Sequence, residues 1–107
     1  TLLATLFPYT TLFRSPAVLN LVANVARAGK DLGKPVGVCG EAAADPLLAC
    51  VLVGLGVTSL SSAPVAAAAV GARLSQTTSD QCREAAEAAL AAEDPEAART
   101  ASAAILL

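Results

Sequence analysis

The 107-residue sequence contains no histidine, methionine or tryptophan, and only three of its residues are aromatic. Apolar residues make up 55% of the chain, but alanine supplies much of that share and bulky side chains are scarce. So few large side chains make a thin hydrophobic core, and alanine-rich helices normally pack against larger neighbours. The composition therefore indicates part of a domain.

Charged residues are also few, and the formal net charge is −2. The sequence shows neither a basic stripe nor a cluster of lysines and arginines, which argues against a nucleic acid or an anionic membrane surface as a partner. The longest nearly unbroken apolar run, residues 47–57, is shorter than the roughly 20 residues that cross a bilayer. We expect a buried helix there and no membrane insertion.

The three cysteines, Cys39, Cys50 and Cys82, are too far apart in sequence for a metal motif such as Cys-x-x-Cys. An odd number of cysteines also fits poorly with a disulfide framework, so a reducing cytoplasm is the simplest compartment. Cys50 and Cys82 fall within helical patterns and are expected in the core.

Every aromatic residue lies within the first 15 residues, which marks a sharp change of composition between Ser15 and Pro16. Residues 5–15 are similar, residue for residue, to the translation of a common short-read sequencing adapter. We therefore predict that residues 1–15 are a non-native, adapter-derived segment and that residues 16–107 are native. The alternative is a hydrophobic N-terminal strand or anchor, although the segment lacks a basic start and is broken by residues 8–11.

From Pro16 onward the sequence predicts helices joined to two short strands. Apolar residues recur at three- and four-residue spacing over residues 16–32, so one face of a helix is expected to point inward. That predicted face consists of Val18, Leu21, Val22, Val25, Ala26, Gly29 and Leu32.

Residues 35–39 and 58–62 are predicted to be strands. A small-residue turn follows Cys39, and a helix then begins at Pro46 and ends at Gly54 or Gly56. The crossover is long enough for the two strands to pair in parallel. Three more helices are predicted over residues 64–74, 79–92 and 95–107. Thr78 and Gln81 fit a capping box, and Asp45 and Asp94 are each followed by proline at the first helical position.

Cys39 is the first candidate for function because it stands at the C-terminal tip of a predicted strand. Ligands bind at this end of the strands in parallel α/β folds. Gly37 and Gly40 either allow a close approach to a ligand or a tight turn, or they serve simple packing. Three serines of the second strand, Ser59, Ser61 and Ser62, are by default solvent-facing.

Two stretches carry a specific resemblance: Val-Gly-Val-Cys-Gly-Glu-Ala-Ala-Ala-Asp-Pro at residues 36–46 and Leu-Val-Gly-Leu-Gly-Val-Thr-Ser-Leu-Ser at residues 52–61. They resemble the C-terminal end of the phosphoenolpyruvate (PEP)-binding barrel of enzyme I, the PEP-protein phosphotransferase family of the bacterial sugar phosphotransferase system. Pyruvate phosphate dikinases typically show His-Gly-Gly after Cys-Gly-Glu, whereas residues 42–44 here are alanines, so enzyme I is favoured.

The resemblance implies an α/β fold that is the C-terminal portion of a (β/α)8 TIM-type barrel, with two parallel strands and flanking helices. A complete barrel of this type needs about 250 residues, so the chain is expected to be a fragment. The same resemblance implies that Cys39 is the catalytic acid that protonates the enolate of PEP, and that Gly40 and Glu41 shape the substrate site.

For the parent enzyme, the resemblance implies PEP as substrate, the small phosphocarrier protein as partner, Mg²⁺ as cofactor, and a homodimer. The phosphoryl-carrying histidine, the substrate-binding arginines and the magnesium ligands of the family are missing here, so the fragment alone is expected to be inactive. The open alternatives are a fragment of pyruvate phosphate dikinase or PEP synthase, and an independent helical interaction module without catalysis.

Overall fold

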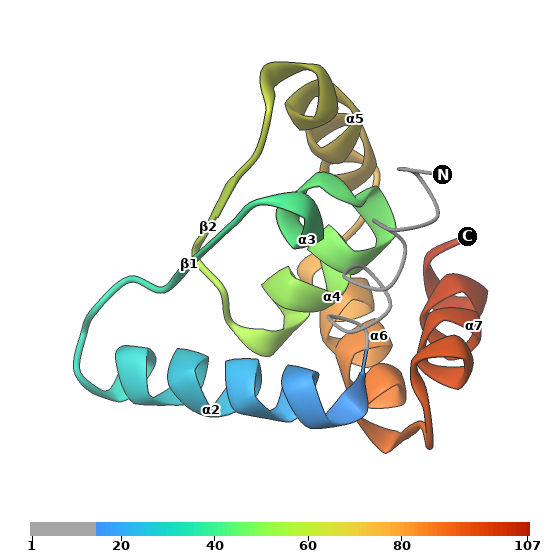
Figure 1. Cartoon of the computed structure of the whole chain (residues 1–107), viewed down its shortest axis with the longest axis horizontal. Coiled ribbons are helices and arrows are strands. Elements are labelled where there is room, and N and C mark those ends of the chain that lie inside the picture. The colour runs from blue at the N-terminus through green and yellow to red at the C-terminus, as the bar shows by residue number, and fades with distance from the viewer. Residues whose placement is uncertain (1–14) are drawn as a thin grey trace, which may run out of the picture.

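The computed structural model describes residues 15–107, and the predictions made for residues 1–14 lie outside this range. Helices dominate, and two short strands pair in parallel (Figure 1). The elements in chain order are α2 (Pro16–Asp31), β1 (Gly37–Cys39), α3 (Glu41–Ala44), α4 (Pro46–Leu55), β2 (Ser59–Ser61), α5 (Pro64–Ser75), α6 (Ser79–Ala91) and α7 (Pro95–Leu106). The predicted α/β unit of two parallel strands with flanking helices is therefore confirmed.

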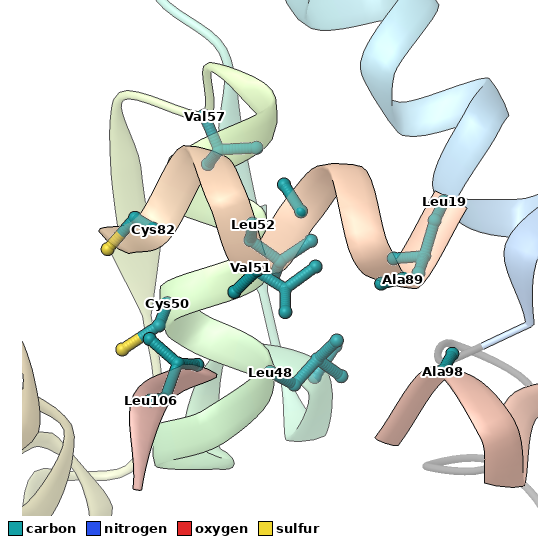
Figure 2. Packing of buried hydrophobic residues seen from close by; sticks show 13 residues of the cluster. Leu19, Leu48, Cys50, Val51, Leu52, Val57, Cys82, Ala89, Ala98 and Leu106 are labelled. Carbon is teal, nitrogen blue, oxygen red and sulfur yellow. The ribbon is translucent and has the colours of Figure 1, made fainter. Parts of the chain in front are cut away.

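The buried core surrounds α4, which is apolar on nearly every side. In Figure 2 its residues Leu48, Cys50, Val51 and Leu52 lie among side chains from the neighbouring helices. Helix α4 contacts every other helix of the described chain, α2, α3, α5, α6 and α7. A helix without a polar face must be covered in this way, so the predicted buried helix is confirmed.

Helix α4 begins and ends as its sequence dictates. The Asp45 carboxylate accepts hydrogen bonds from the amides of Leu47 and Leu48, at 3.0 and 3.3 Å, and Pro46 occupies the first helical position. The helix ends at Leu55 because Gly56 takes a left-handed conformation with φ of +108°, which glycine adopts without steric cost.

Helix α2 packs against α4 and α6 through a face that matches the predicted one only in part, since Ala26 and Gly29 are buried as predicted. Its exposed apolar residues include Leu21, Val25 and Leu32, at 65%, 58% and 74% exposure, so the prediction was wrong for these three. Apolar residues form two adjacent stripes on this helix, and periodicity alone does not say which stripe meets the core. The buried stripe is Leu19, Ala23, Ala26 and Gly29, whose mostly small side chains let the helices come close.

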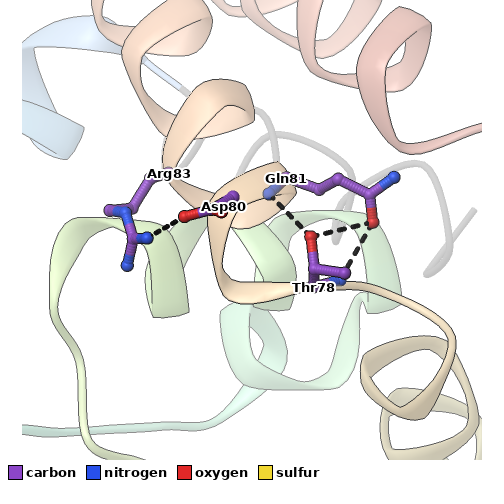
Figure 3. A network of polar contacts seen from close by, with 4 residues as sticks. All are labelled: Thr78, Asp80, Gln81 and Arg83. Atoms are coloured by element: carbon purple, nitrogen blue, oxygen red, sulfur yellow. Dashed lines mark hydrogen bonds and ion pairs between the residues drawn. The ribbon is translucent and has the colours of Figure 1, made fainter.

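Helices α6 and α7 follow their predicted caps. At the start of α6, the backbone amide of Gln81 donates to Thr78 Oγ1 at 3.1 Å, and the backbone amide of Thr78 donates to Gln81 Oε1 at 2.9 Å. These two hydrogen bonds complete the capping box (Figure 3). At the start of α7, the Ala97 amide donates to Asp94 Oδ1 at 2.8 Å. The buried positions of Cys50 and Cys82 were also predicted correctly.

Two local predictions need correction. Residues 41–44 form the short helix α3, where a small-residue turn was expected; glutamate and alanine favour helix, and extended Asp45 before Pro46 ends it. Both strands are shorter than predicted, at three residues each. The described residues include no helix that is both long and apolar enough to cross a membrane.

Candidate functional site

Cys39 is the last residue of β1, at the C-terminal end of the parallel pair. Its register partner is Ser61, the last residue of β2, and two residues earlier Gly37 pairs with Ser59. Side chains alternate along a strand, and registered partners share a face. Gly37, Cys39, Ser59 and Ser61 therefore lie on one face of the sheet.

This face is open in the described part of the chain. Cys39 and both serines are exposed, whereas Val38 and Leu60, on the opposite face, are partly buried and pack against the core. In Figure 1 the helices α3 to α7 lie to one side of the two strands. The sheet thus presents a thiol and two hydroxyls on the side away from its helices.

The side chain of Thr58 holds the beginnings of the strands together. The Val36 amide donates to Thr58 Oγ1 at 2.9 Å, and that hydroxyl donates to the Val36 carbonyl oxygen at 3.0 Å. The Val36 carbonyl also accepts from the Thr58 amide at 2.8 Å. Because a side chain satisfies the Val36 amide, the regular ladder begins one residue later, at Gly37.

Gly37 leaves room for its neighbour across the sheet. A Cβ atom at this position would lie 2.6 Å from Ser59 Oγ, closer than real Cβ contacts allow. The absence of a side chain therefore lets Ser59 lie against β1. The sequence left two interpretations of Gly37 open, a ligand or turn position and simple packing. The structure shows packing at Gly37.

Gly40 has a different role from Gly37. Its φ of +97° is strained for any residue with a side chain, while the space around it is open. Its amide donates to the Ser61 carbonyl oxygen at 3.0 Å, which extends the strand pairing by one bond before the chain turns. Gly40 thus makes the tight turn that leads from Cys39 into α3.

Glu41 follows directly as the first residue of α3, and it is exposed. It forms no ion pair with any other residue in the described range. Cys39, Gly40 and Glu41, which the sequence singled out together, therefore occupy one exposed turn at the C-terminal end of the sheet. Their role in substrate binding stays a prediction.

The three thiols differ in their surroundings. Cys39 is exposed, whereas Cys50 and Cys82 are buried between α4 and α6. Burial, and then the neighbouring Cys50 thiol, raise the pKa of Cys82 from 9.0 to about 11. Cys82 is therefore kept protonated and shielded, and only Cys39 can meet a ligand from solution.

Sequence reasoning did not find the supporting contacts of Thr58 and Ser59. Both residues act on partners 22 positions earlier in the chain, and the only local signal was a hydroxyl-rich strand. The described residues also contain no group of three or more His, Cys, Asp or Glu side chains that could hold a metal ion.

Comparison with known proteins agrees with this geometry. The family described as "PEP-utilising enzyme, PEP-binding domain" matches residues 9–79. The match includes Cys39 and both strands, and it also reaches into the segment predicted to be adapter-derived. The boundary of the native chain at Pro16 therefore stays a prediction.

Individual relatives are similar over most of the chain. The PEP-protein phosphotransferase of Streptomyces coelicolor is 59% identical over 85% of the chain, and that of Haloferax volcanii is 38% identical over 76%. A probable PEP synthase of Pyrococcus horikoshii is 43% identical over 46% of the chain.

The chain spans only a small part of these relatives: 16%, 14% and 6% of their respective lengths. The family match covers the sheet, the thiol at its C-terminal end and helices α2 to α5. This agrees with the predicted C-terminal portion of a TIM-type barrel. The chain belongs to the family of PEP-utilising enzymes and corresponds to part of their PEP-binding domain.

Proposed function

We propose that this chain supplies the proton-donating thiol of a PEP-protein phosphotransferase. The single observation that carries the proposal is the position of Cys39, the exposed thiol at the C-terminal end of the parallel strands. Ligands of parallel α/β folds bind at that end. Gly40 sets the turn beside the thiol, and Glu41 shapes the rim of the site.

The proposed chemistry divides between this chain and the rest of the enzyme. The bond between phosphorus and the enol oxygen of PEP breaks, and the phosphoryl group passes to a histidine outside this chain. The remaining enolate takes a proton at its methylene carbon from Cys39 Sγ, which gives pyruvate and leaves a thiolate that water reprotonates. A cysteine thiol suits this role because its unperturbed pKa of about 8.5 keeps it mostly protonated near neutrality.

Two observations favour a phosphotransferase over the related PEP synthases and pyruvate phosphate dikinases. The phosphotransferase from Streptomyces coelicolor matches 85% of the chain, whereas the PEP synthase from Pyrococcus horikoshii matches 46%. Residues 42–44 are alanines, where the dikinases typically continue with His-Gly-Gly. A PEP synthase or dikinase is the second candidate.

The remaining functions belong to the proposed parent enzyme. It would pass its phosphoryl group to the small phosphocarrier protein for sugar uptake, act in the cytoplasm, and form a homodimer. The described residues do not fit a magnesium site, because they include no cluster of metal-binding side chains. We therefore assign the Mg²⁺ ligands to parts of the parent outside this chain.

A chimeric enzyme tests the role of Cys39. Residues 16–107 would replace the matching region of the Streptomyces coelicolor phosphotransferase, with and without Cys39→Ser. Serine keeps the size of the side chain but is a far weaker acid than cysteine. We expect pyruvate formation to fall about 10²- to 10⁴-fold, as for loss of a general acid, while the dissociation constant for PEP and the formation of phosphohistidine change little.

The matched control is Ser61→Ala, which removes a polar group from the register partner of Cys39 on the same face. The control should form pyruvate as fast as the unaltered chimera. Equal pyruvate formation by the Cys39→Ser chimera, measured by rapid quench, would show that another group protonates the enolate.

A further inference from the structure

An open groove with a volume of about 510 Å³ runs between α2, the C-terminal end of α4 and α6. It reaches Thr58, just before β2, and so lies at the end of the strands opposite to Cys39. Ligand pockets commonly have volumes of about 300–1,000 Å³. The groove is therefore large enough for a small metabolite and is separate from the proposed PEP site.

Positive charge is concentrated in this groove. Its lining includes Arg27, Lys30, Lys34 and Arg83, which are four of the six basic residues in the described range. The one acidic residue in the lining is Glu87. Arg27, Lys30 and Lys34 lie within eight residues of one another in the sequence, and the fold brings the distant Arg83 to the same groove.

Most of these cations lack a charged partner. Arg83 pairs with Asp80 on its own helix (Figure 3). Arg27 donates to the neutral Asn24 amide at 3.2 Å, and within residues 15–107 neither it nor the two lysines forms an ion pair. Arg27 and Lys30 are three residues apart on one helix, a spacing at which like charges repel. A bound anion would remove this repulsion.

Small residues leave room between the charged walls. Besides Leu55 and Leu90, the uncharged lining of the groove is mostly small: Ala23, Ala26, Gly54, Gly56 and Ala86. Long cationic side chains around these small residues can turn inward onto a ligand. This shape differs from a flat charged surface, where the side chains would point apart into solvent.

A structural role for the cations explains only part of the cluster. Cations stabilise the C-terminal ends of helices, and Lys30 lies in the last turn of α2. Arg83, near the beginning of α6, is paired with Asp80, so helix ends and ion pairs leave Arg27 and Lys34 unexplained. A common function in binding negative charge accounts for all four.

We propose that this groove binds a small molecule carrying two or more phosphate groups, at a site distinct from that of PEP. Lysine and arginine are the usual partners of phosphate oxygens, and arginine can bind them through two parallel hydrogen bonds. A diphosphate matches several cations better than a single carboxylate does. The ligand class is therefore phosphorylated metabolites with adjacent phosphates.

Titration of the full 107-residue chain with inorganic pyrophosphate tests the proposal. Calorimetry at constant ionic strength gives the affinity, and amide chemical shifts in NMR spectra locate the ligand. We expect saturable binding with shifts around Lys30, Gly54 and Gly56. The double variant Lys30→Gln with Lys34→Gln should bind about tenfold more weakly, since two charge-assisted contacts are lost.

The matched control is Arg73→Gln with Arg99→Gln, which removes two cations outside the groove. Both double variants change the formal net charge equally, from −2 to −4, and the control also removes the contacts of Arg73 with the Leu106 carbonyl oxygen and of Arg99 with Asp45. The control and Cys39→Ala should bind pyrophosphate as the unaltered chain does. Binding that depends on Cys39 would place pyrophosphate at the proposed PEP site instead.

Three results would overturn the proposal: no saturable binding, an equal loss of affinity in both double variants, or shifts confined to the sheet face around Cys39. Circular dichroism must show equal helix content in all variants. If the glutamine variant loses helix, Lys30→Arg with Lys34→Arg replaces it; this pair keeps the charge, so failure to bind pyrophosphate would contradict the proposal.

Discussion

Gly54 lies where α4 and α6 approach each other closely. A Cβ atom at Gly54 would lie 2.0 Å from the Cys82 carbonyl oxygen and 2.9 Å from the Ala86 Cβ. The nearest obstacle is backbone, which cannot move aside as a flexible side chain can. In the Gly-Leu-Gly sequence, Gly54 thus permits helix packing, whereas Gly56 ends the helix.

We predict that Gly54→Ala lowers the free energy of unfolding by about 1–3 kcal/mol or more, the usual cost of overpacking. The matched control is Gly71→Ala on α5, where a new methyl group meets no atom within 4 Å. That change should raise the free energy of unfolding by up to about 1 kcal/mol, because alanine favours helix. Urea titration followed by circular dichroism measures both, and equal effects would contradict this account of Gly54.

At the scale of elements, the start of α4 depends on Asp45. Besides its two cap hydrogen bonds, its Oδ2 atom lies 3.8 Å from Arg99 Nη1 of α7. One side chain therefore begins the central helix and also approaches the last helix. The cap should matter more than the ion pair, because Arg99 is half exposed and such pairs contribute little.

We predict that Asp45→Ala lowers the free energy of unfolding by about 1–2 kcal/mol through loss of the cap. Asp45→Asn keeps a cap oxygen but removes the charge, so it should cost less than half as much. Thermal melts of both variants, with Arg99→Gln as a third, measure the two contributions separately. An asparagine variant as unstable as the alanine variant would show that charge is the main contribution.

Elements with local signals could be predicted from the sequence, and those that depend on distant partners could not. The caps at Asp45, Thr78 and Asp94 were predicted because each is set by neighbours within three residues. The buried face of α2 was predicted only in part, because the choice between two apolar stripes depends on α4 and α6. Helix α3 was missed because four residues are too short to show a period.

The candidate functional site shows the same difference between features with local sequence signals and features that depend on distant contacts. The position of Cys39 at a strand tip followed from a short apolar run and the turn after it. The contact of Thr58 with Val36 did not follow, because the two residues are 22 positions apart, and the groove did not follow, because part of its lining comes from α4 and α6. These features form only when the chain folds, so no local sequence pattern predicts them.

At the scale of the whole molecule, the described chain leaves apolar and hydrogen-bonding surface uncovered. Each strand has a single neighbour in the described range, so both outer edges of the sheet are free. Leu21, Val25 and Leu32 on α2 and Val65 on α5 are large, apolar and exposed. Free strand edges and exposed apolar stripes both favour association with another chain.

Two views of the chain predict different behaviour in solution. If it is part of a barrel, the exposed stripe of α2 and the strand edges normally meet other parts of the same domain. The isolated chain should then associate with itself as its concentration rises. If it is an independent helical interaction module, it should stay monomeric and unfold cooperatively. The match to a small part of each longer relative favours the first view.

We therefore predict concentration-dependent association of the 107-residue chain in sedimentation velocity experiments. The double variant Leu21→Glu with Val25→Glu should raise the concentration at which half of the chain is associated by about tenfold or more, because it places charge in the apolar stripe. Asn20→Glu with Asn24→Glu adds the same charge at exposed polar positions of α2 and should shift it far less. A chain that remains monomeric over the whole concentration range would favour the independent module, because a barrel fragment with uncovered strand edges and an exposed apolar stripe should associate.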